Sequence, residues 1–169
     1  MVDAPQASSF VGLISDTHGL LRPEVLTALT GSSLILHAGD VGDPSILTTL
    51  ERIAPVRAVY GNTDGGELRR LMNETEVVSV ANGVDVYLLH ILDDLNLDAA
   101  AAGLRAVIYG HTHTPKIERR GAVLYVNPGS AGPRRPNLPV TLARMFVEHD
   151  GLRVEIVDLL GDVTDQRWS

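Results

Sequence analysis

The sequence predicts an α/β fold that carries polar residues at the ends of its strands. Apolar runs at residues 10–15 and 33–38 are typical of strands buried on both faces of a parallel sheet. Each run is followed by a segment of helical character. Each run also ends close to a carboxylate, Asp16 after the first and Asp40 after the second. Ligands in open α/β sheets bind beyond the carboxyl ends of the strands, so we expect these residues to converge.

The first part of the chain alternates strands with helices. Residues 22–29 place a proline at a helix N-terminus and apolar residues at helical spacing. Residues 44–53 begin with a proline in the same way, directly after Asp43, which is suited to cap a helix. A third strand at residues 56–60 leads to Asn62. The order predicts three strand ends with polar side chains.

Beyond residue 64 the pattern changes towards antiparallel pairing. Turn signals such as Asn82-Gly83, in which both residues tolerate positive φ, separate short runs of β-forming residues. The expected elements are a short helix at 65–73, strands at 76–80 and 84–89, an alanine-rich helix at 95–102, a strand at 106–109, a hairpin within 116–126 that turns near Gly121, and a last hairpin at 141–148 and 152–158.

Composition limits the class of protein. A chain of 169 residues is expected to form one domain, here residues 10–169 after a frayed start at residues 1–9. The absence of cysteine excludes disulfides, iron–sulfur clusters and thiol nucleophiles. No stretch approaches the roughly 20 apolar residues of a membrane span, and the start lacks a signal-peptide pattern, so a cytoplasmic protein is expected. The sequence leaves homo-oligomerisation open.

The net charge of −7 argues against broad nucleic-acid binding, because lysine and arginine drive contacts with the phosphate backbone. Any phosphate-bearing substrate must therefore be held locally.

Histidines follow two strands of the second half. The apolar run before Gly110 presents His111 and His113 at a turn, where residues two apart leave an extended backbone on the same side. Two exposed turn histidines are an equally ordinary interpretation of this pair. His90 follows the strand at residues 84–89, where a satisfied core histidine is the common alternative.

The strand-end groups suit metal binding as a set. They all ligate through oxygen or nitrogen and outnumber the ligands of one four- to six-coordinate ion, which favours two ions with a shared carboxylate. Mixed histidine and carboxylate ligands favour manganese, with iron, zinc, nickel or cobalt as alternatives, over magnesium. Two ions about 3.5 to 4 Å apart lower the pKa of a bridging water and stabilise a phosphoryl displacement. The candidate ligands are Asp16, His18, Asp40, Asn62, His90, His111 and His113.

The motifs have a familiar order. Asp16-x-His18, Gly39-Asp40, Gly61-Asn62-x-Asp64, His90 and Gly110-His111-Thr112-His113 resemble, in this order, the calcineurin-like metallophosphoesterase superfamily. The short chain is most similar to its small single-domain bacterial and archaeal phosphodiesterases. The resemblance covers about residues 10–158. It implies a calcineurin-like β-sandwich of two mixed sheets between helices, four layers in the order αββα, with the site above the sandwich.

The resemblance also implies roles for the ligands. Asp16, His18 and His113 would serve one metal and Asn62, His90 and His111 the other, with Asp40 between them. The implied activity is hydrolysis of a small phosphate ester by a metal-bound hydroxide, with a diester favoured over a monoester. The residues expected to act in catalysis are Asp40, Asn62 and His111, and those expected to contact substrate are Asn62, Arg134 and Arg135, although ordinary surface exposure is the alternative for both arginines.

Two other functions fit the same resemblance. The superfamily includes a non-catalytic interaction scaffold, the retromer scaffold subunit. A nuclease is the other alternative, which the acidic charge of this chain disfavours. Two positions also depart from the usual pattern. Thr63 stands where many members have a histidine thought to protonate the leaving group, and Ile91 stands where glycine usually follows the histidine.

The remaining polar candidates have ordinary interpretations. His37 lies inside an apolar strand and is expected in the core or behind a ligand. His149 is expected in a solvated turn. Asp64 and Asp43 are suited to orient ligating imidazoles, although a helix cap is the favoured role for Asp43. The segment 127–130 resembles a loop found near the site in this family.

Overall fold

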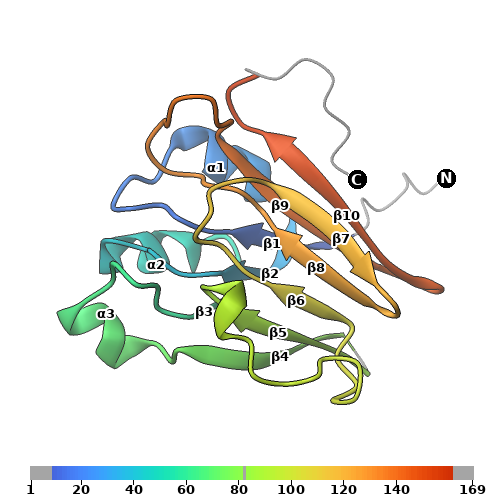
Figure 1. Ribbon diagram of the computed structural model, residues 1–169. Helices are drawn as coiled ribbons and strands as arrows, with labels where there is room; N and C mark the ends of the chain where they lie inside the picture. Colours follow the sequence, from blue (N-terminus) through green and yellow to red (C-terminus); the bar gives the residue numbers. More distant parts are fainter. Residues whose placement is uncertain (1–8, 82, 162–169) are drawn as a thin grey trace, which may run out of the picture.

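Two five-stranded sheets pack face to face in the computed structural model, which describes residues 9–81 and 83–161 (Figure 1). In spatial order, the first sheet consists of β10 (Gly151–Asp158), β9 (Thr141–Glu148), β1 (Phe10–Ile14), β2 (Ser32–His37) and β3 (Val56–Ala58). The second consists of β4 (Thr75–Ala81), β5 (Val84–Leu89), β6 (Ala106–Ile108), β8 (Val123–Asn127) and β7 (Lys116–Arg120). The two mixed sheets are as expected. The predicted frayed start lies outside the described residues except for Ser9, and so does Asn82 of the predicted hairpin turn.

The first sheet combines parallel and antiparallel pairs. β1, β2 and β3 pair in parallel, while β9 runs antiparallel to both β1 and β10. In the second sheet β5, β6 and β8 are parallel, and β4 and β7 form antiparallel edges. The alternating first part of the sequence therefore forms the parallel strands of one sheet, as predicted. The predicted hairpins supply every antiparallel pair except that of β1 with β9.

Short helices follow the strands of the first sheet: α1 (Pro23–Leu29), α2 (Pro44–Leu50) and α3 (Gly66–Leu71). A proline lies at the N-terminal end of both α1 and α2, and Asp43 caps α2 by accepting the amide hydrogen of Ser45 at 2.8 Å. The capping role predicted for Asp43 is confirmed. Among the described residues no helix combines the length and the apolar composition that crossing a membrane requires.

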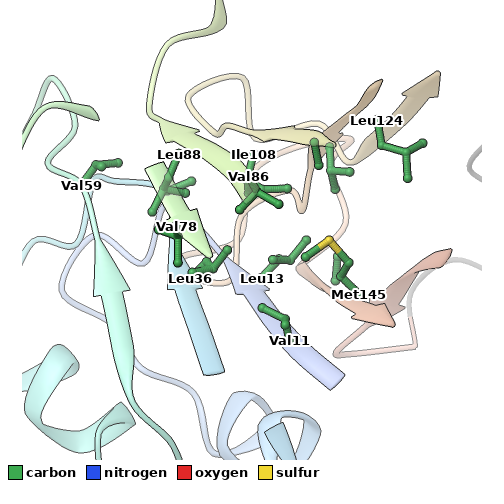
Figure 2. Packing of buried hydrophobic residues seen from close by; sticks show 14 residues of the cluster. Val11, Leu13, Leu36, Val59, Val78, Val86, Leu88, Ile108, Leu124 and Met145 are labelled. Carbon is green, nitrogen blue, oxygen red and sulfur yellow. The ribbon is translucent and has the colours of Figure 1, made fainter. Parts of the chain in front are cut away.

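The core between the sheets comes from alternating strand residues. Val11 and Leu13 of β1 pack with residues of both sheets, including Val86 and Ile108 (Figure 2). Ile14, one position on, faces the other way and joins the cluster formed with α1 and α2. Because successive side chains of a strand point to opposite faces, a strand covered on both sides is apolar throughout. This explains the unbroken apolar run at the start of the chain.

The outer face of the second sheet differs from the predicted α-helical layer. The helix expected at residues 95–102 is absent; a 3₁₀ turn, η1 (Leu92–Asp94), and an irregular segment cover Tyr87 and neighbouring residues there. The Asp98 side chain accepts a hydrogen bond from the Ala101 amide, as a helix cap does. Gly103, at φ +75°, ends the single turn that follows, and the Leu104 amide donates to the Ala99 carbonyl across it. These cap and stop signals leave four alanines between them, too few to propagate a helix.

Candidate metal centre

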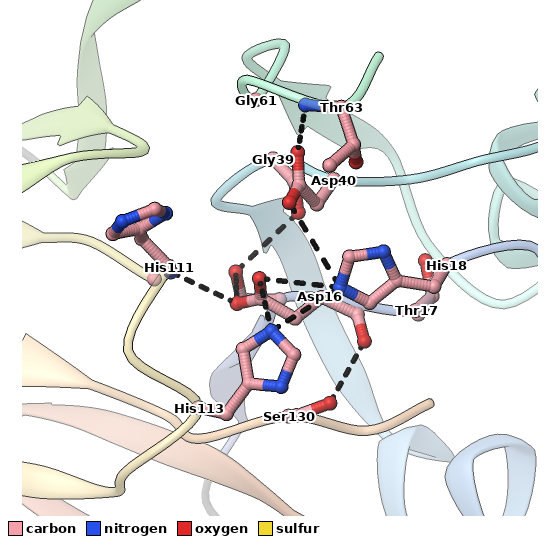
Figure 3. A network of polar contacts seen from close by, with 12 residues as sticks. Asp16, Thr17, His18, Gly39, Asp40, Gly61, Thr63, His111, His113 and Ser130 are labelled. Carbon is pink, nitrogen blue, oxygen red and sulfur yellow. Dashed lines mark hydrogen bonds and ion pairs between the residues drawn. The ribbon is translucent and has the colours of Figure 1, made fainter. Parts of the chain in front are cut away.

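The polar residues predicted at strand ends lie together at one edge of the sandwich (Figure 3). Both sheets contribute to this edge. Asp16 and His18 follow β1 and Asp40 follows β2 in the first sheet, while His90 follows β5 and His113 lies five residues beyond β6 in the second. Side chains far apart in sequence therefore meet where the two sheets end.

Asp16 has one satisfied oxygen and one unsatisfied oxygen. Its Oδ2 accepts hydrogen bonds from the Ser15 hydroxyl at 2.6 Å and from the His111 amide at 3.1 Å. Its Oδ1 is buried and has no hydrogen-bond partner, although His113 Nε2 lies 3.1 Å away. Burying a carboxylate oxygen without a donor is costly unless a cation compensates for it. A buried carboxylate oxygen without a donor is therefore suited to bind a metal ion.

His18 and His113 approach the same oxygen from different sheets. Their Nε2 atoms lie 3.2 Å apart, and His18 Nε2 lies 3.7 Å from Asp16 Oδ1. Burial lowers the pKa of His18, opposed by the Asp16 and Asp40 carboxylates and reinforced by the positive charge of Arg135. A lowered pKa keeps an imidazole neutral, which is the form that binds metals. Asp16, His18 and His113 form one compact set of candidate ligands.

Asp40 and His90 contribute to a second set, together with Asp16. His90 Nδ1 lies 2.7 Å from the Ala38 carbonyl, which can only accept, so Nδ1 carries the hydrogen and Nε2 faces Asp40 Oδ2 at 3.3 Å. Burial disfavours the ionised form of Asp40. The hydrogen bonds that its carboxylate accepts from His90 and from the Thr63 amide outweigh this effect and lower the pKa of Asp40 well below its ordinary value. Burial likewise opposes protonation of His90, yet its pKa is raised by the bond to Asp40 and by the charge of Asp16.

Asn62 and His111 occupy the exposed end of the cluster. Asn62 Oδ1 lies 3.0 Å from His90 Nε2 and 3.0 Å from His111 Nδ1. Both residues are exposed to solvent. An amide oxygen and two imidazole nitrogens thus meet where a substrate can approach. The structure brings all seven predicted ligands to this one region.

The backbone of the cluster is unusual. Asp16, His18, Asp40, His111 and His113 all have φ between +46° and +70°. Residues other than glycine seldom adopt this left-handed conformation, which costs on the order of 1 kcal/mol or more at each position and is concentrated at functional sites. The surrounding fold holds the five residues there. The sequence alone gave no indication of this strain.

Glycines allow the close approach of the strand-end loops. A Cβ atom on Gly39 would lie 2.7 Å from the His90 ring, one on Gly61 would lie 2.1 Å from Asp40 Oδ1, and one on Gly110 would lie 2.0 Å from Ser15 Oγ. Side chains at these positions would displace the candidate ligands or the groups that hold them.

Asp64 and His37 support the loops from behind. Asp64 is buried and accepts amide hydrogens from Val41, Gly42 and Gly61, so it holds backbone in place and, contrary to expectation, its hydrogen bonds do not orient an imidazole. His37 is fully buried, as expected. His149 lies exposed in the last hairpin turn, also as expected.

A defined hydrogen-bond chain passes through His37. The Gly39 amide donates to His37 Nδ1 at 3.2 Å, so the hydrogen of the neutral ring is on Nε2, 3.0 Å from Thr17 Oγ1. The Thr17 hydroxyl in turn donates to the Val41 carbonyl at 2.9 Å. The chain connects the loop that carries Asp16 with the loop that carries Asp40.

The segment 127–130, at the end of β8, lies near the site as the resemblance implied, but the role of its side chains was not predicted. The buried Asn127 donates to the Gly110 carbonyl at 2.9 Å and to Thr112 Oγ1 at 3.0 Å, and the Ser130 hydroxyl donates to the Asp16 carbonyl at 2.9 Å. These bonds hold the backbone of two ligand-bearing loops. Asn127 is the last residue of β8, and the candidate ligands follow other strands, so its position at a strand end was the available signal.

The remaining predicted positions have simple surroundings. Arg134 and Arg135 are both exposed, and the charge of Arg135 acts on the His18 pKa. Ile91, with φ −105° and ψ 116°, has ordinary extended backbone, so the path beside His90 does not require glycine. The Thr63 amide donates to Asp40 Oδ1 at 2.9 Å, which places this residue beside the candidate ligands.

Three curated relatives share most of the chain. A probable metallophosphoesterase of Methanothermobacter thermautotrophicus is 37% identical over 159 residues, which are 87% of this chain and 91% of the relative. A probable metallophosphoesterase of Methanocaldococcus jannaschii is 33% identical over 157 residues, 88% of this chain and 81% of the relative. A phosphodiesterase of the same organism is 30% identical over 138 residues, 70% of this chain and 82% of the relative.

Solved structures share the fold. An archaeal phosphodiesterase superposes with a TM-score of 0.70 at 23% identity, covering 88% of this chain and 99% of the other. Vacuolar protein sorting 29 of Cryptosporidium parvum superposes with a TM-score of 0.69 at 19% identity, covering 88% and 96%. The family model described as the calcineurin-like phosphoesterase superfamily domain matches residues 10–150. The chain therefore belongs to the calcineurin-like phosphoesterase superfamily.

Proposed function

We propose that this protein is a binuclear metal-dependent phosphodiesterase. The observation that carries the proposal is the buried Asp16 Oδ1, which lacks a hydrogen-bond donor and is close to nitrogen atoms of His113, His18 and His90. Oxygen and nitrogen donors of this kind suit divalent transition metals. The 30% identity to a phosphodiesterase supports the choice of a diester over a monoester.

The proposed ligands divide between two ions. Asp16, His18 and His113 would hold one, and His90, His111 and Asn62 the other, with Asp40 shared. Asp40 Oδ2 lies 3.8 Å from His18 Nε2 and 3.3 Å from His90 Nε2, so it reaches one residue of each set. The ions, for which we propose manganese, would supply Lewis acidity and lower the pKa of a water molecule.

The residues of the chain prepare the reacting geometry. The Ala38 carbonyl holds the His90 ring so that its Nε2 faces Asp40 Oδ2. The Thr63 amide donates to Asp40 Oδ1 and leaves Oδ2 directed towards His90. Asn62, at the exposed end, is placed to donate from its amide nitrogen to a phosphate oxygen. Arg135 would contribute positive charge near the His18 side of the substrate.

Metal removal and replacement test the proposal. Protein stripped with a chelator should lose hydrolysis of bis(p-nitrophenyl) phosphate and regain it with Mn²⁺, with about two equivalents bound per chain. His113→Ala should reduce both metal content and activity, whereas His149→Ala, at an exposed turn, should change neither. Fully metallated protein that cleaves neither diesters nor p-nitrophenyl phosphate would contradict the enzyme assignment and favour an interaction scaffold. Salt-sensitive DNA binding with cleavage would favour a nuclease.

A further inference from the structure

A cavity of about 420 Å³ adjoins the proposed metal site. Asn62 and His90 form the wall nearest the metal ligands, and Tyr60, Arg69 and Tyr87 line the remainder with residues around η1. The volume falls in the range of small-molecule sites and exceeds what a methyl or ethyl substituent needs. A phosphate held at Asn62 would direct one of its ester substituents into this cavity.

Arg69 of α3 is fixed at the side of the cavity. Its guanidinium carbon lies 4.5 Å from the centre of the Tyr60 ring, and its Nε donates to the Asp64 carbonyl at 2.6 Å. Asp64 also holds the Gly61 amide, so Arg69 is tied to the loop that carries Asn62. Within the described part of the chain, the terminal nitrogens of Arg69 make no hydrogen bond, and the side chain is exposed. One face and the terminal donors of a preorganised guanidinium are thus available to a ligand.

The charges around the cavity restrict what it accepts. Arg69 is its basic residue, while Glu74 and Asp94 supply two exposed carboxylates. A further anionic group in the cavity would meet more negative than positive charge. An uncharged group with hydrogen-bond donors and acceptors is favoured, because the carboxylates accept hydrogen bonds and the Asn96 amide both donates and accepts them.

We propose that this cavity is a specificity site for a planar, uncharged diester substituent of nucleoside size, which stacks on the Arg69 guanidinium above Tyr60. The inference rests on the proposed phosphodiesterase function and names the substrate class of that same site: phosphodiesters that bear a nucleoside on one side. Stacking of a base on an aromatic or guanidinium plane tolerates different bases, so the site recognises the class and not one base.

Two substrates with one leaving group test the site. The p-nitrophenyl ester of thymidine 5′-phosphate and p-nitrophenyl methyl phosphate both release p-nitrophenol and differ in the substituent that remains. In the Mn²⁺-loaded protein, kcat/KM should favour the thymidine ester by on the order of tenfold, mainly through KM, which is the size of one stacking contact. A phosphate added at the thymidine 3′-oxygen should reduce this preference.

Substitutions in α3 test whether Arg69 is the source of the preference for the thymidine ester. Arg69→Ala should reduce the ratio of the two kcat/KM values towards one, and Arg69→Lys should also reduce it, because lysine keeps the charge but lacks the planar group. The ratio cancels any general effect of the substitution on the metal site. Arg70→Ala, an exposed neighbour outside the cavity lining, should leave the ratio unchanged.

The outcomes separate this inference from the function on which it rests. A ratio near one in the unsubstituted protein, with metal-dependent hydrolysis of the methyl ester, overturns the specificity site and leaves the phosphodiesterase assignment standing. A ratio that both Arg69 variants leave intact also overturns it. If neither ester is hydrolysed, the enzyme assignment fails, and thymidine binding measured by NMR then tests the cavity by itself. Binding that is lost in Arg69→Lys and kept in Arg70→Ala supports the specificity site. Absence of thymidine binding in the unsubstituted protein overturns it.

Discussion

The Ala38 carbonyl accepts a hydrogen bond from His90 Nδ1 at 2.7 Å, and this contact determines which nitrogen of the ring faces Asp40. Ala38 follows β2 of the first sheet, whereas His90 follows β5 of the second. The bond therefore aligns a ligand from one sheet with a ligand from the other. A histidine whose second nitrogen is held by a carbonyl is typical of metal sites, because the bond fixes ring orientation and tautomer.

Asp40→Asn should cost the protein both metals. As the proposed shared ligand, Asp40 contributes charge to both ions, whereas Asp16, which lies near both sets of side chains, is assigned to the ion of His18 and His113. We expect metal analysis to find close to zero equivalents in Asp40→Asn and about one in Asp16→Asn, with activity lost in both.

Asp43→Asn provides the matched control, since the same chemical change falls at the cap of α2. It should retain two metals. Its free energy of unfolding should change by less than about 1 kcal/mol, because asparagine also caps helices. Near-normal turnover in metal-loaded Asp40→Asn would refute the shared-ligand role, and selective loss of both metals in Asp16→Asn would transfer that role to Asp16.

Gly110→Ala should disturb Asp16. The added methyl group would lie 2.0 Å from Ser15 Oγ and 2.7 Å from Asp16 Oδ2, so both side chains must move. We expect a loss of about 1–3 kcal/mol in the free energy of unfolding, measured in urea, and a larger relative loss of metal affinity. Gly65→Ala is the control, because a Cβ there meets nothing within 4 Å. Equal metal affinity in the two variants would contradict the proposed placement of Asp16.

Sequence patterns predicted the strands and the residues at their ends because both depend on local order along the chain. They did not predict how the second sheet is covered, because Asp98 and Gly103 limit the alanine run to a single turn. The left-handed backbone of Asp16 and His113 also escaped prediction. These conformations are imposed by contacts between distant segments, such as the bond from Ser130 to the Asp16 carbonyl, which no local pattern contains.

His37 should make the stability of the metal-free protein depend on pH. Burial lowers the pKa of His37 to about 4, against an ordinary value of 6.5. Below pH 6.5 the unfolded chain takes up the proton first, so this contribution to stability is full above pH 6.5, falls as the pH drops towards 4, and then levels off. The pKa difference corresponds to about 3 kcal/mol.

Urea unfolding in the presence of chelator at several pH values measures this contribution. His37→Gln keeps a donor for Thr17 and does not titrate, so its stability should fall less between pH 6.5 and 4 than that of the unsubstituted protein. His149→Gln, at an exposed position, should behave like the unsubstituted protein. Parallel curves for His37→Gln and the unsubstituted protein would show that His37 does not carry this dependence.

Because Thr63 stands where a general acid would be needed, we expect the rate of hydrolysis to depend steeply on the pKa of the leaving group. The Thr63 hydroxyl does not act as an acid near neutral pH, and Asp64, the nearest alternative, is engaged with three backbone amides. A positioned general acid contributes roughly 10² to 10⁴ in rate, so activated aryl esters should far exceed alkyl esters as substrates. A series of diesters with leaving groups of graded pKa measures the slope.

Thr63→His should flatten that slope if position 63 faces the leaving group. A flat dependence in the unsubstituted protein would reveal an acid elsewhere in the site. A steep slope in both proteins would confirm the missing acid and show that position 63 points away from the departing oxygen.

The division of the candidate ligands between two sheets has a mechanical consequence. An ion held by Asp40 of one sheet and His90 of the other would cross-link the open end of the sandwich. This chain has no cysteine with which to make a covalent cross-link. Because such an ion binds only the folded arrangement, resistance to heat would increase with the concentration of free metal, logarithmically once that concentration exceeds the dissociation constant. The same loops that hold the ions for chemistry would then clamp the two layers together.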